Sequence, residues 1–195
     1  MKKDRNPKPK ETSGDEDEEL TMLHCAAVKG KSEVVTFLLE HGHEANTVTN
    51  KGMTPLHSAA IGDHKEVALL LLENGAKPNS KNNLGGTPLL YAALKDFFGT
   101  ARVLLKHGAN VHVIDNSGGT PLHFASSSGS CKVVKLLLAN GANVNAKDKD
   151  GKTPLDVATV AVANILRRHL DKCGKSSKKS PKDSPPWKGL DPYNN

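Results

Sequence analysis

The stretch that decides the fold is Thr54-Pro55-Leu56-His57-Ser58-Ala59-Ala60. Related stretches stand in register every thirty-three residues and begin at Thr21, Thr87, Thr120 and Thr153. Five copies with one fixed period are typical of a stacked array, in which each unit buries its apolar side against its neighbours. The sequence therefore predicts one elongated domain of repeats rather than a globular enzyme.

Each copy carries the signals that start a helix. A Thr side chain accepts a hydrogen bond from an unpaired backbone N–H two or three residues later, and Pro at the first helical position sacrifices no hydrogen bond. These signals are Thr21, Thr54 and Pro55, Thr87 and Pro88, Thr120 and Pro121, and Thr153 and Pro154. We therefore expect a helix to begin at each of these threonines.

A second helix in each repeat is indicated by apolar residues at helical spacing, such as Val67, Leu70 and Leu71. A Gly follows each of these segments in register, and Gly adopts the left-handed conformation past a helix end without steric cost. The glycines are Gly42, Gly75, Gly108, Gly141 and Gly174. We expect each of them to end a helix.

The T-P-L-H-x-A pattern resembles the ankyrin repeat family, and its in-frame repetition makes the resemblance specific. The resemblance implies an all-α fold, an ankyrin repeat solenoid of five helix-turn-helix repeats with short β-hairpin-like loops. The repeats would start near Leu20, Met53, Gly86, Gly119 and Lys152. In the family the loops project beside the first helices and form a concave face.

The motif histidines His24, His57 and His123 suggest two roles. Imidazole is a common metal ligand, but in the family this His bonds the backbone of the adjacent loop, and we favour that structural role. Asp156 can replace it as a polar group, whereas Leu90 cannot. We expect no metal and no cofactor.

No motif of a serine hydrolase, a phosphate-binding loop, a dinucleotide fold or a zinc protease occurs in the sequence. Cys25, Cys131 and Cys173 are too widely spaced for a disulfide framework or a metal site, and we take them as reduced thiols. Cys25 shares its motif position with Tyr91 and Phe124, so we expect a packed side chain there. The protein is predicted not to be an enzyme.

The two ends of the array depart from the pattern. Met22 replaces Pro in the first repeat, which we interpret as an N-terminal cap. His169 and Asp171 give the last repeat the polar outer face that a terminal repeat needs. Val162 replaces the Gly between its two helices, so we expect these helices to run together.

The folded part is expected to span residues 20–174, between two disordered tails. Residues 1–19 are basic and then acidic, and residues 175–195 are rich in Lys, Ser and Pro, so neither segment can bury a core. The sequence has neither an apolar run of membrane-spanning length nor a secretory signal. We expect a cytoplasmic protein that also enters the nucleus if its basic tails act as import signals.

Three residues are candidate modification sites. Ser180 and Ser184 each precede a Pro and are candidates for phosphorylation. Asn46, Asn79 and Asn145 recur near the ends of repeats, where a loop hydrogen bond is their first role. Resemblance to the family makes Asn145 a candidate for hydroxylation as well.

Partner contacts in the family fall on the loop tips and just after the Ala pair of the motif. At these positions we select Lys29, Lys51, Met53, Ile61, Leu84, Leu94, Lys95, Lys149 and Lys152. They form a basic surface with an apolar centre on a chain of net charge +6. We predict a monomer that binds an acidic protein or peptide segment with apolar anchors, and no small-molecule substrate.

The alternative function is a nuclear or chromatin-associated regulator whose basic tails contact nucleic acid or an import receptor. Sequence-specific or single-strand binding proteins usually combine basic residues with aromatic ones, and the tails lack that combination. We therefore rank nucleic-acid binding second.

Overall fold

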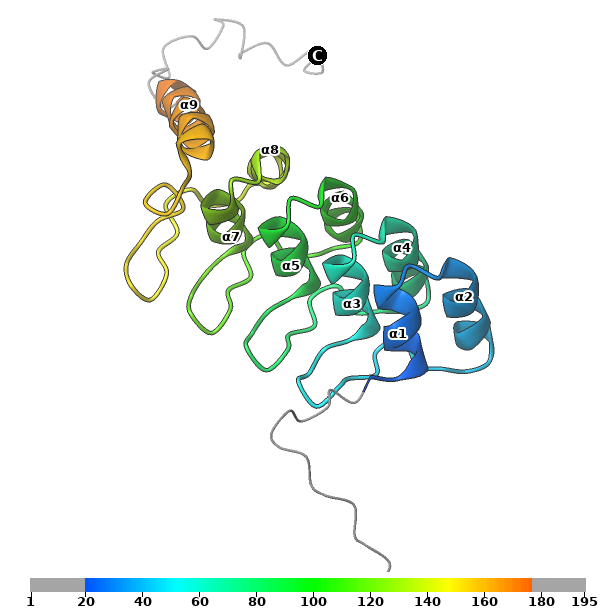
Figure 1. The fold of residues 1–195 in the computed structure, drawn as a ribbon. Helices are drawn as coiled ribbons and strands as arrows, with labels where there is room; N and C mark the ends of the chain where they lie inside the picture. The colour runs from blue at the N-terminus through cyan, green and yellow to red at the C-terminus, as the bar shows by residue number, and fades with distance from the viewer. Residues whose placement is uncertain (1–19, 177–195) are drawn as a thin grey trace, which may run out of the picture.

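The computed structural model describes residues 20–176, and Figure 1 shows the fold. Its helices are α1 (Met22–Val28), α2 (Ser32–Glu40), α3 (Pro55–Ile61), α4 (Lys65–Glu73), α5 (Pro88–Leu94), α6 (Phe98–Lys106), α7 (Pro121–Ser128), α8 (Cys131–Ala139) and α9 (Val160–Ser176). Within these residues there is no strand, so the expected all-α class is confirmed. The two tails, apart from the last residues of α9, lie outside the described residues.

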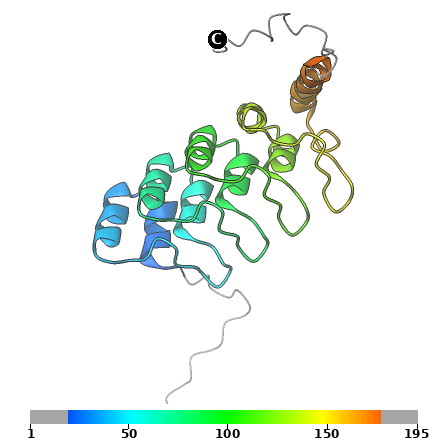
Figure 2. The ribbon, with the colours of Figure 1, turned by 180° about the vertical axis from the view of Figure 1, so that it is seen from behind.

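The helices pair along the chain, and the pairs stack in sequence order (Figure 1). One row of inner helices contains α1, α3, α5 and α7, and a second row of outer helices contains α2, α4, α6 and α8. After each of the first three outer helices the chain returns through a long loop to the next inner helix. These loops project side by side, as the view from behind also shows (Figure 2).

The inner helices begin where the sequence predicts. α1, α3, α5 and α7 each start at the residue after the motif Thr. The hydroxyls of Thr21, Thr54 and Thr120 accept the backbone N–H of the residue three positions later. At two of these caps the motif His returns the bond, since the Nδ1 atoms of His57 and His123 accept the N–H groups of Thr54 and Thr120.

The outer helices end at glycine, also as predicted. Gly42, Gly75, Gly108 and Gly141 all have φ between 82° and 85°. The following N–H bonds back to a carbonyl in the last turn, as from Ala76 to Leu71 at 2.9 Å. Ala76, Ala109 and Ala142 are buried at this position and cover the helix end, which completes the usual left-handed stop.

The core is a double row of leucines that repeats with the sequence period. The inner row is Leu23, Leu56, Leu89 and Leu122, and the outer row is Leu38, Leu71, Leu104 and Leu137. None of these side chains is more than 6% exposed. Each contributes roughly 2 kcal/mol by burial, and every pair of helices depends on its neighbours for that contribution.

Two aspartates tie neighbouring repeats together between the rows. Asp63 and Asp96 both adopt φ 58°, at the position that Gly30 takes in the first repeat. Asp63 Oδ1 accepts the hydroxyl of Thr100 at 2.9 Å, and Asp96 Oδ1 accepts the N–H of Val133 at 3.2 Å. These bonds fix the register of α6 and α8 against the preceding repeat.

The last unit differs from the predictions in its helices and in the role of Gly174. No helix begins at Thr153, because residues 154–157 form turns and α9 starts only at Val160. Four helix pairs and a single terminal helix therefore stand where five complete repeats were expected, and the two expected helices do not run together. Gly174 does not end a helix either, since α9 continues to Ser176.

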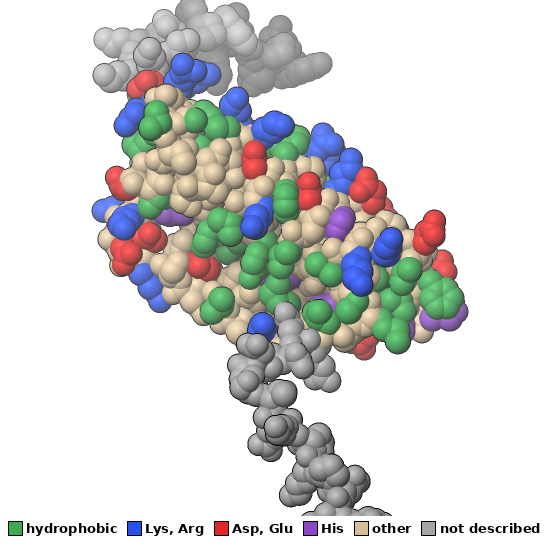
Figure 3. All heavy atoms as spheres, viewed as in Figure 1, with side chains coloured by type: hydrophobic (Ala, Val, Ile, Leu, Met, Phe, Trp, Pro, Cys, Tyr) green, Lys and Arg blue, Asp and Glu red, His purple; other side chains and the backbone are tan. Residues whose placement is uncertain are grey.

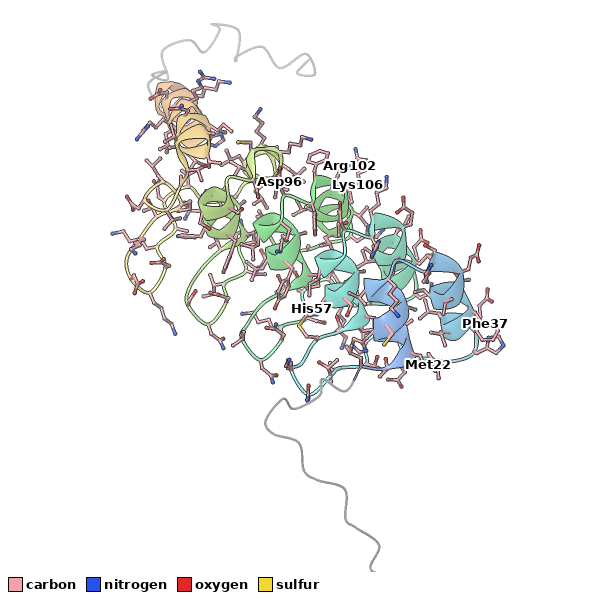
Figure 4. The ribbon with its side chains drawn as sticks, in the orientation of Figure 1. Met22, Phe37, His57, Asp96, Arg102 and Lys106 are labelled. Atoms are coloured by element: carbon pink, nitrogen blue, oxygen red, sulfur yellow. The ribbon has the colours of Figure 1, made fainter. Side chains whose placement is uncertain are left out.

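The first repeat, interpreted above as an N-terminal cap, carries apolar side chains at its outer end. Leu20, Met22, Val34 and Phe37 are between 43% and 72% exposed at this end of the stack. Met22 lies on α1 and Phe37 on α2, at the N-terminal end of the array in Figure 4. The side chains that would meet a preceding repeat are therefore apolar and open to solvent rather than polar.

The third repeat lacks the motif His and provides a test of the cap. Thr87 is buried with its hydroxyl unpaired, because Leu90 stands where the first, second and fourth repeats have His. We predict that Leu90→His, measured at pH 8 by urea unfolding, raises the free energy of unfolding by about 1 kcal/mol. The new imidazole would bond the Thr87 hydroxyl and the carbonyl of Gly119, which now accepts only the N–H of Asp115 at 3.1 Å.

Thr87→Val is the matched control. In the parent chain it removes an unpaired hydroxyl, so it should be neutral or slightly stabilising. In the Leu90→His background it should cost about 1 kcal/mol. Additive effects of the two substitutions would contradict the proposed bond.

Candidate partner-binding surface

The motif histidines connect each inner helix to the loop that follows it. Their Nε2 atoms contact backbone carbonyls twenty-nine residues later: His24 at Met53 (2.8 Å), His57 at Gly86 (3.0 Å) and His123 at Lys152 (3.0 Å). Their Nδ1 atoms contact the motif Thr hydroxyls at 2.8 Å. His57 lies in the first turn of α3 (Figure 4), and its ring reaches the Gly86 carbonyl at the base of the next loop. Both ring nitrogens are bonded, so these histidines act as structural ties between the helix cap and the loop.

Each loop is a hairpin closed by a backbone bond, although none contains an assigned strand. The closing bonds run from Thr49 to Met53 (3.0 Å), from Asn82 to Gly86 (2.9 Å), from Asp115 to Gly119 (3.1 Å) and from Asp148 to Lys152 (3.0 Å). Neighbouring hairpins are joined at their edges, as from Asn83 to Lys51 and from Asn116 to Leu84, both at 3.0 Å. The loops therefore form one continuous strip beside the inner helices.

Two adjoining hollows lie between this strip and the inner helices. The first, about 400 Å³, is lined by Lys51, Met53, Asn82, Asn83, Leu84 and Tyr91. The second, about 150 Å³, is lined by Leu84, Gly86, Leu90, Tyr91, Leu94, Asp115 and Phe124. Because they share Leu84 and Tyr91, we treat them as one surface, the inner groove. A patch of hydrophobic side chains lies over the middle of the stack in Figure 3.

A side-chain cluster fixes the floor of the inner groove. Asn82 is buried, and its Oδ1 accepts the N–H groups of Leu84 (3.0 Å) and Gly86 (2.8 Å). Its Nδ2 lies 2.7 Å from the Tyr91 hydroxyl and 3.2 Å from the Met53 sulfur. Tyr91 also stacks edge-on against His57, with ring centroids 6.0 Å apart. The loop, the helix and the aromatic ring are therefore held in one arrangement.

The structure brings together some of the predicted contact residues and separates others. Lys51, Met53, Leu84 and Leu94 line the inner groove. Lys29 instead lines a hollow at the N-terminal end, and Ile61, Lys95, Lys149 and Lys152 are at the surface outside the two hollows. Met53 is only 8% exposed, so it forms part of the floor rather than a free contact. Leu84 is 71% exposed and is the main open apolar side chain.

Sequence reasoning missed the two aromatic residues of the inner groove. Tyr91 and Phe124 occupy the motif position of Cys25, where we expected packed side chains. All three are half-buried, and each lines a surface hollow. The available signal was that this position varies among Cys, Ser, Tyr, Phe and Val while the Ala after it is constant. Such variation is typical of a surface position.

Burial controls the charge of the histidine beside the inner groove. It lowers the pKa of His57 from 6.5 to about 4, against a smaller opposing effect of the bond to Gly86. His57 is therefore neutral at pH 7. In the last unit, bonds from Thr153 lower the pKa of Asp156, which takes the local capping role of the missing His.

The remaining candidate sites are less closely defined. Asn46 and Asn79 bond the carbonyls of Gly75 and Gly108 in the next repeat, at 2.8 and 2.9 Å. Asn145 is exposed, and its hydroxylation stays a prediction. Ser180 and Ser184 lie outside the described residues.

Within residues 20–176, no group of three or more His, Cys, Asp and Glu residues is placed to hold a metal ion. No helix in the same range is long and apolar enough to cross a bilayer.

Paired short helices, stacked in register and joined by edge-linked hairpins, define a helical repeat solenoid. Within this class the chain belongs to the ankyrin repeat family: the family of ankyrin repeats in three copies matches residues 5–82 and again residues 77–148. Ankyrin repeats are generally protein–protein interaction modules and typically have no catalytic activity. No curated protein matches the chain.

The lowered pKa of His57 predicts a pH dependence of stability. Between pH 6.5 and about 4 the unfolded chain takes up a proton at this residue and the folded chain does not. Stability is therefore complete above pH 6.5 and falls as the pH falls, by on the order of 3 kcal/mol at the low end. We predict that His57→Leu reduces the loss of unfolding free energy between pH 7 and pH 4.5, measured by urea titration.

The comparison uses the change in unfolding free energy between pH 7 and pH 4.5. A lower stability of the variant at pH 7 therefore does not affect it. His43→Gln is the control, because His43 is exposed; its slope should match that of the parent. An unchanged slope in His57→Leu would show that other groups cause the acid destabilisation.

Proposed function

We propose that this chain is a non-enzymatic adaptor that binds a segment of a partner protein in the inner groove. The observation that carries the proposal is the pair of joined hollows, in which exposed Leu84 stands beside the half-buried rings of Tyr91 and Phe124. Apolar and aromatic residues in a preformed groove are typical of binding hot spots. The bonds of Asn82 hold this groove in place without a partner, which lowers the ordering cost of binding.

The charges at the two ends of the inner groove suggest the polarity of the partner. Lys51 lines the first hollow and Asp115 lines the second. The Oδ1 atom of Asp115 is already used by the N–H groups of Ser117 and Gly119 and by the Ser117 hydroxyl. Lys51 is exposed and places a positive charge at the edge of the first hollow. We propose that the partner sets an acidic residue against Lys51 and an apolar anchor against Leu84.

The proposal also concerns the state of the protein in the cell. We propose that it acts as a monomer in the cytoplasm, and in the nucleus if its basic segments are recognised for import. Nearly all residues of those segments lie outside the described residues. The binding of nucleic acid through them remains the second candidate, and the shape of the inner groove supports the first.

A displayed library of random linear peptides, selected against the full chain, tests the proposal. We predict that Leu84→Ser weakens the selected peptides at least fivefold, as expected for an apolar hot spot, and that Lys51→Glu weakens them about threefold or more at low salt. Affinities would be measured by fluorescence anisotropy at two salt concentrations, since the effect of Lys51 should shrink as ionic strength rises.

Matched controls carry the same chemical changes elsewhere. Val160→Ser changes an exposed apolar residue on α9, and Lys106→Glu reverses a charge on α6, which Figure 4 shows on the outer row. Both should bind the peptides as the parent does. Peptides that bind Leu84→Ser and Lys51→Glu normally, but lose affinity for a control variant, would place the binding surface elsewhere.

A further inference from the structure

The outer helices carry a charge gradient along the stack. α2 and α4 hold Glu33, Glu40, Glu66 and Glu73, with Lys65 as their basic residue. α6 and α8 hold Arg102, Lys106, Lys132 and Lys135 and no acidic residue, and α9 adds Arg167, Arg168 and Lys172 against Asp171. Figure 3 shows Lys and Arg side chains along the upper edge of the molecule, over the outer helices and α9. The C-terminal end of this face is therefore strongly basic.

A groove crosses this basic end between α8 and α9. Its volume is about 390 Å³, and α8 contributes Lys135, Leu138 and Ala139 to it. From α9 come Ile165, Arg168, His169 and Lys172. The spacing of three and four residues places each set on one face of its helix. We call this surface the outer groove, and it shares no residue with the inner groove.

The incomplete last unit explains why the outer groove exists. In the other repeats an outer helix packs against its own inner helix and against the outer helices beside it. Residues 154–157 form turns instead of an inner helix, so among the described helices α9 packs mainly against α8. A helix held on one side by a single neighbour leaves a furrow along that contact.

The floor and rim of the outer groove have different chemistry. Leu138, Ala139 and Ile165 give an apolar floor, while Lys135 and Arg168 stand exposed on opposite sides. In the part of the chain whose side chains are described, neither Lys135 nor Arg168 forms an ion pair. From Ile165 to Lys172 the groove follows α9 for seven residues, roughly 10 Å or two helical turns.

We infer that the outer groove binds a short acidic amphipathic helix of a partner protein. A helix laid along two turns can place apolar residues at spacing three and four on the floor, and acidic residues on both sides of that stripe against Lys135 and Arg168. Apolar anchors supply affinity and the flanking charges supply orientation and association rate. This binding site is separate from the inner groove and does not depend on it.

Three other occupants fit the chemistry less well. A nucleic-acid backbone would match the basic rim but not the apolar floor, because phosphate contacts are polar. The acidic run at residues 15–19 of the chain is DEDEE and offers no apolar side chain for the floor. Residues 177–195 have four lysines and two aspartates, so their charge is of the same sign as the rim. A partner helix meets both requirements.

The test uses a synthetic helical peptide of about 14 residues, with Leu at positions three and four apart and Glu on both sides of that stripe. Its affinity for the full chain would be measured by fluorescence anisotropy, beside a scrambled peptide of the same composition and a duplex DNA. We expect the double variant Lys135→Glu/Arg168→Glu to weaken the amphipathic peptide at least tenfold. Ala139→Glu, which adds a charge to the floor, should weaken it about as much.

The double variant Arg102→Glu/Lys106→Glu is the matched control, because it makes the same charge change on α6, outside the outer groove. It should weaken the peptide less than threefold. Leu84→Ser, in the inner groove, should leave it unchanged, so the two sites fail or succeed separately. All the changed residues except Leu84 lie on the outer helices or α9. Thermal unfolding of each variant checks that its fold is retained.

Three outcomes would overturn the inference. Equal losses in the α6 and outer-groove variants would show attraction by net charge alone. Equal binding of the scrambled peptide would show that the apolar floor takes no part. Loss of DNA binding, rather than of peptide binding, in Lys135→Glu/Arg168→Glu would identify nucleic acid as the ligand of this surface.

Discussion

The bond from the motif imidazole to the carbonyl of the next loop is the contact on which the binding surface depends. One ring completes the cap of its own helix through Nδ1 and holds the following hairpin through Nε2, as in His57 at Gly86. Burial keeps that ring neutral, so one nitrogen can donate while the other accepts. Leu90 interrupts this series, and the second hollow of the inner groove lies beside Leu90. The inner groove thus includes the one inner helix, α5, whose motif position lacks the histidine tie to its loop.

Stacking explains why the interior of the array is regular and its ends are not. Leu56 and Leu89 are buried by neighbours on two sides, so their repeats cannot change shape without exposing them. Within residues 20–176 the last unit has a neighbouring repeat on one side only, and Asp156 bonds Thr153. An inner helix there would gain little burial from the described residues to offset the entropy of ordering it. At the other end of this range, Met22 is exposed, and no described repeat precedes α1.

Most of the fold could be predicted from the sequence, because helix caps and glycine stops act over a few residues. Thr54 and Gly75 mark helix boundaries through local backbone geometry. Thr153 and Gly174 carry the same local signals but lack the packing that makes them effective, so prediction failed there. The inner groove was predicted only in part: Lys51 and Leu84 were found by their place in the loops. Tyr91 and Phe124 were missed because the degree of burial depends on the neighbouring loop, which the period alone does not place.

The side chains of the inner groove and of the outer groove are not equally free to change. The inner groove is built on backbone bonds such as Asn116 to Leu84, so a change of shape there disturbs the next hairpin. The outer helices bury one stripe and leave the other faces free to vary in charge. With a screening length of about 8 Å at physiological ionic strength, the basic residues of α8 and α9 act on ligands at their own end of the stack and hardly on those near α2. A charge gradient on this face therefore distinguishes one end of the solenoid from the other, whereas a uniform charge would only raise attraction along its whole length.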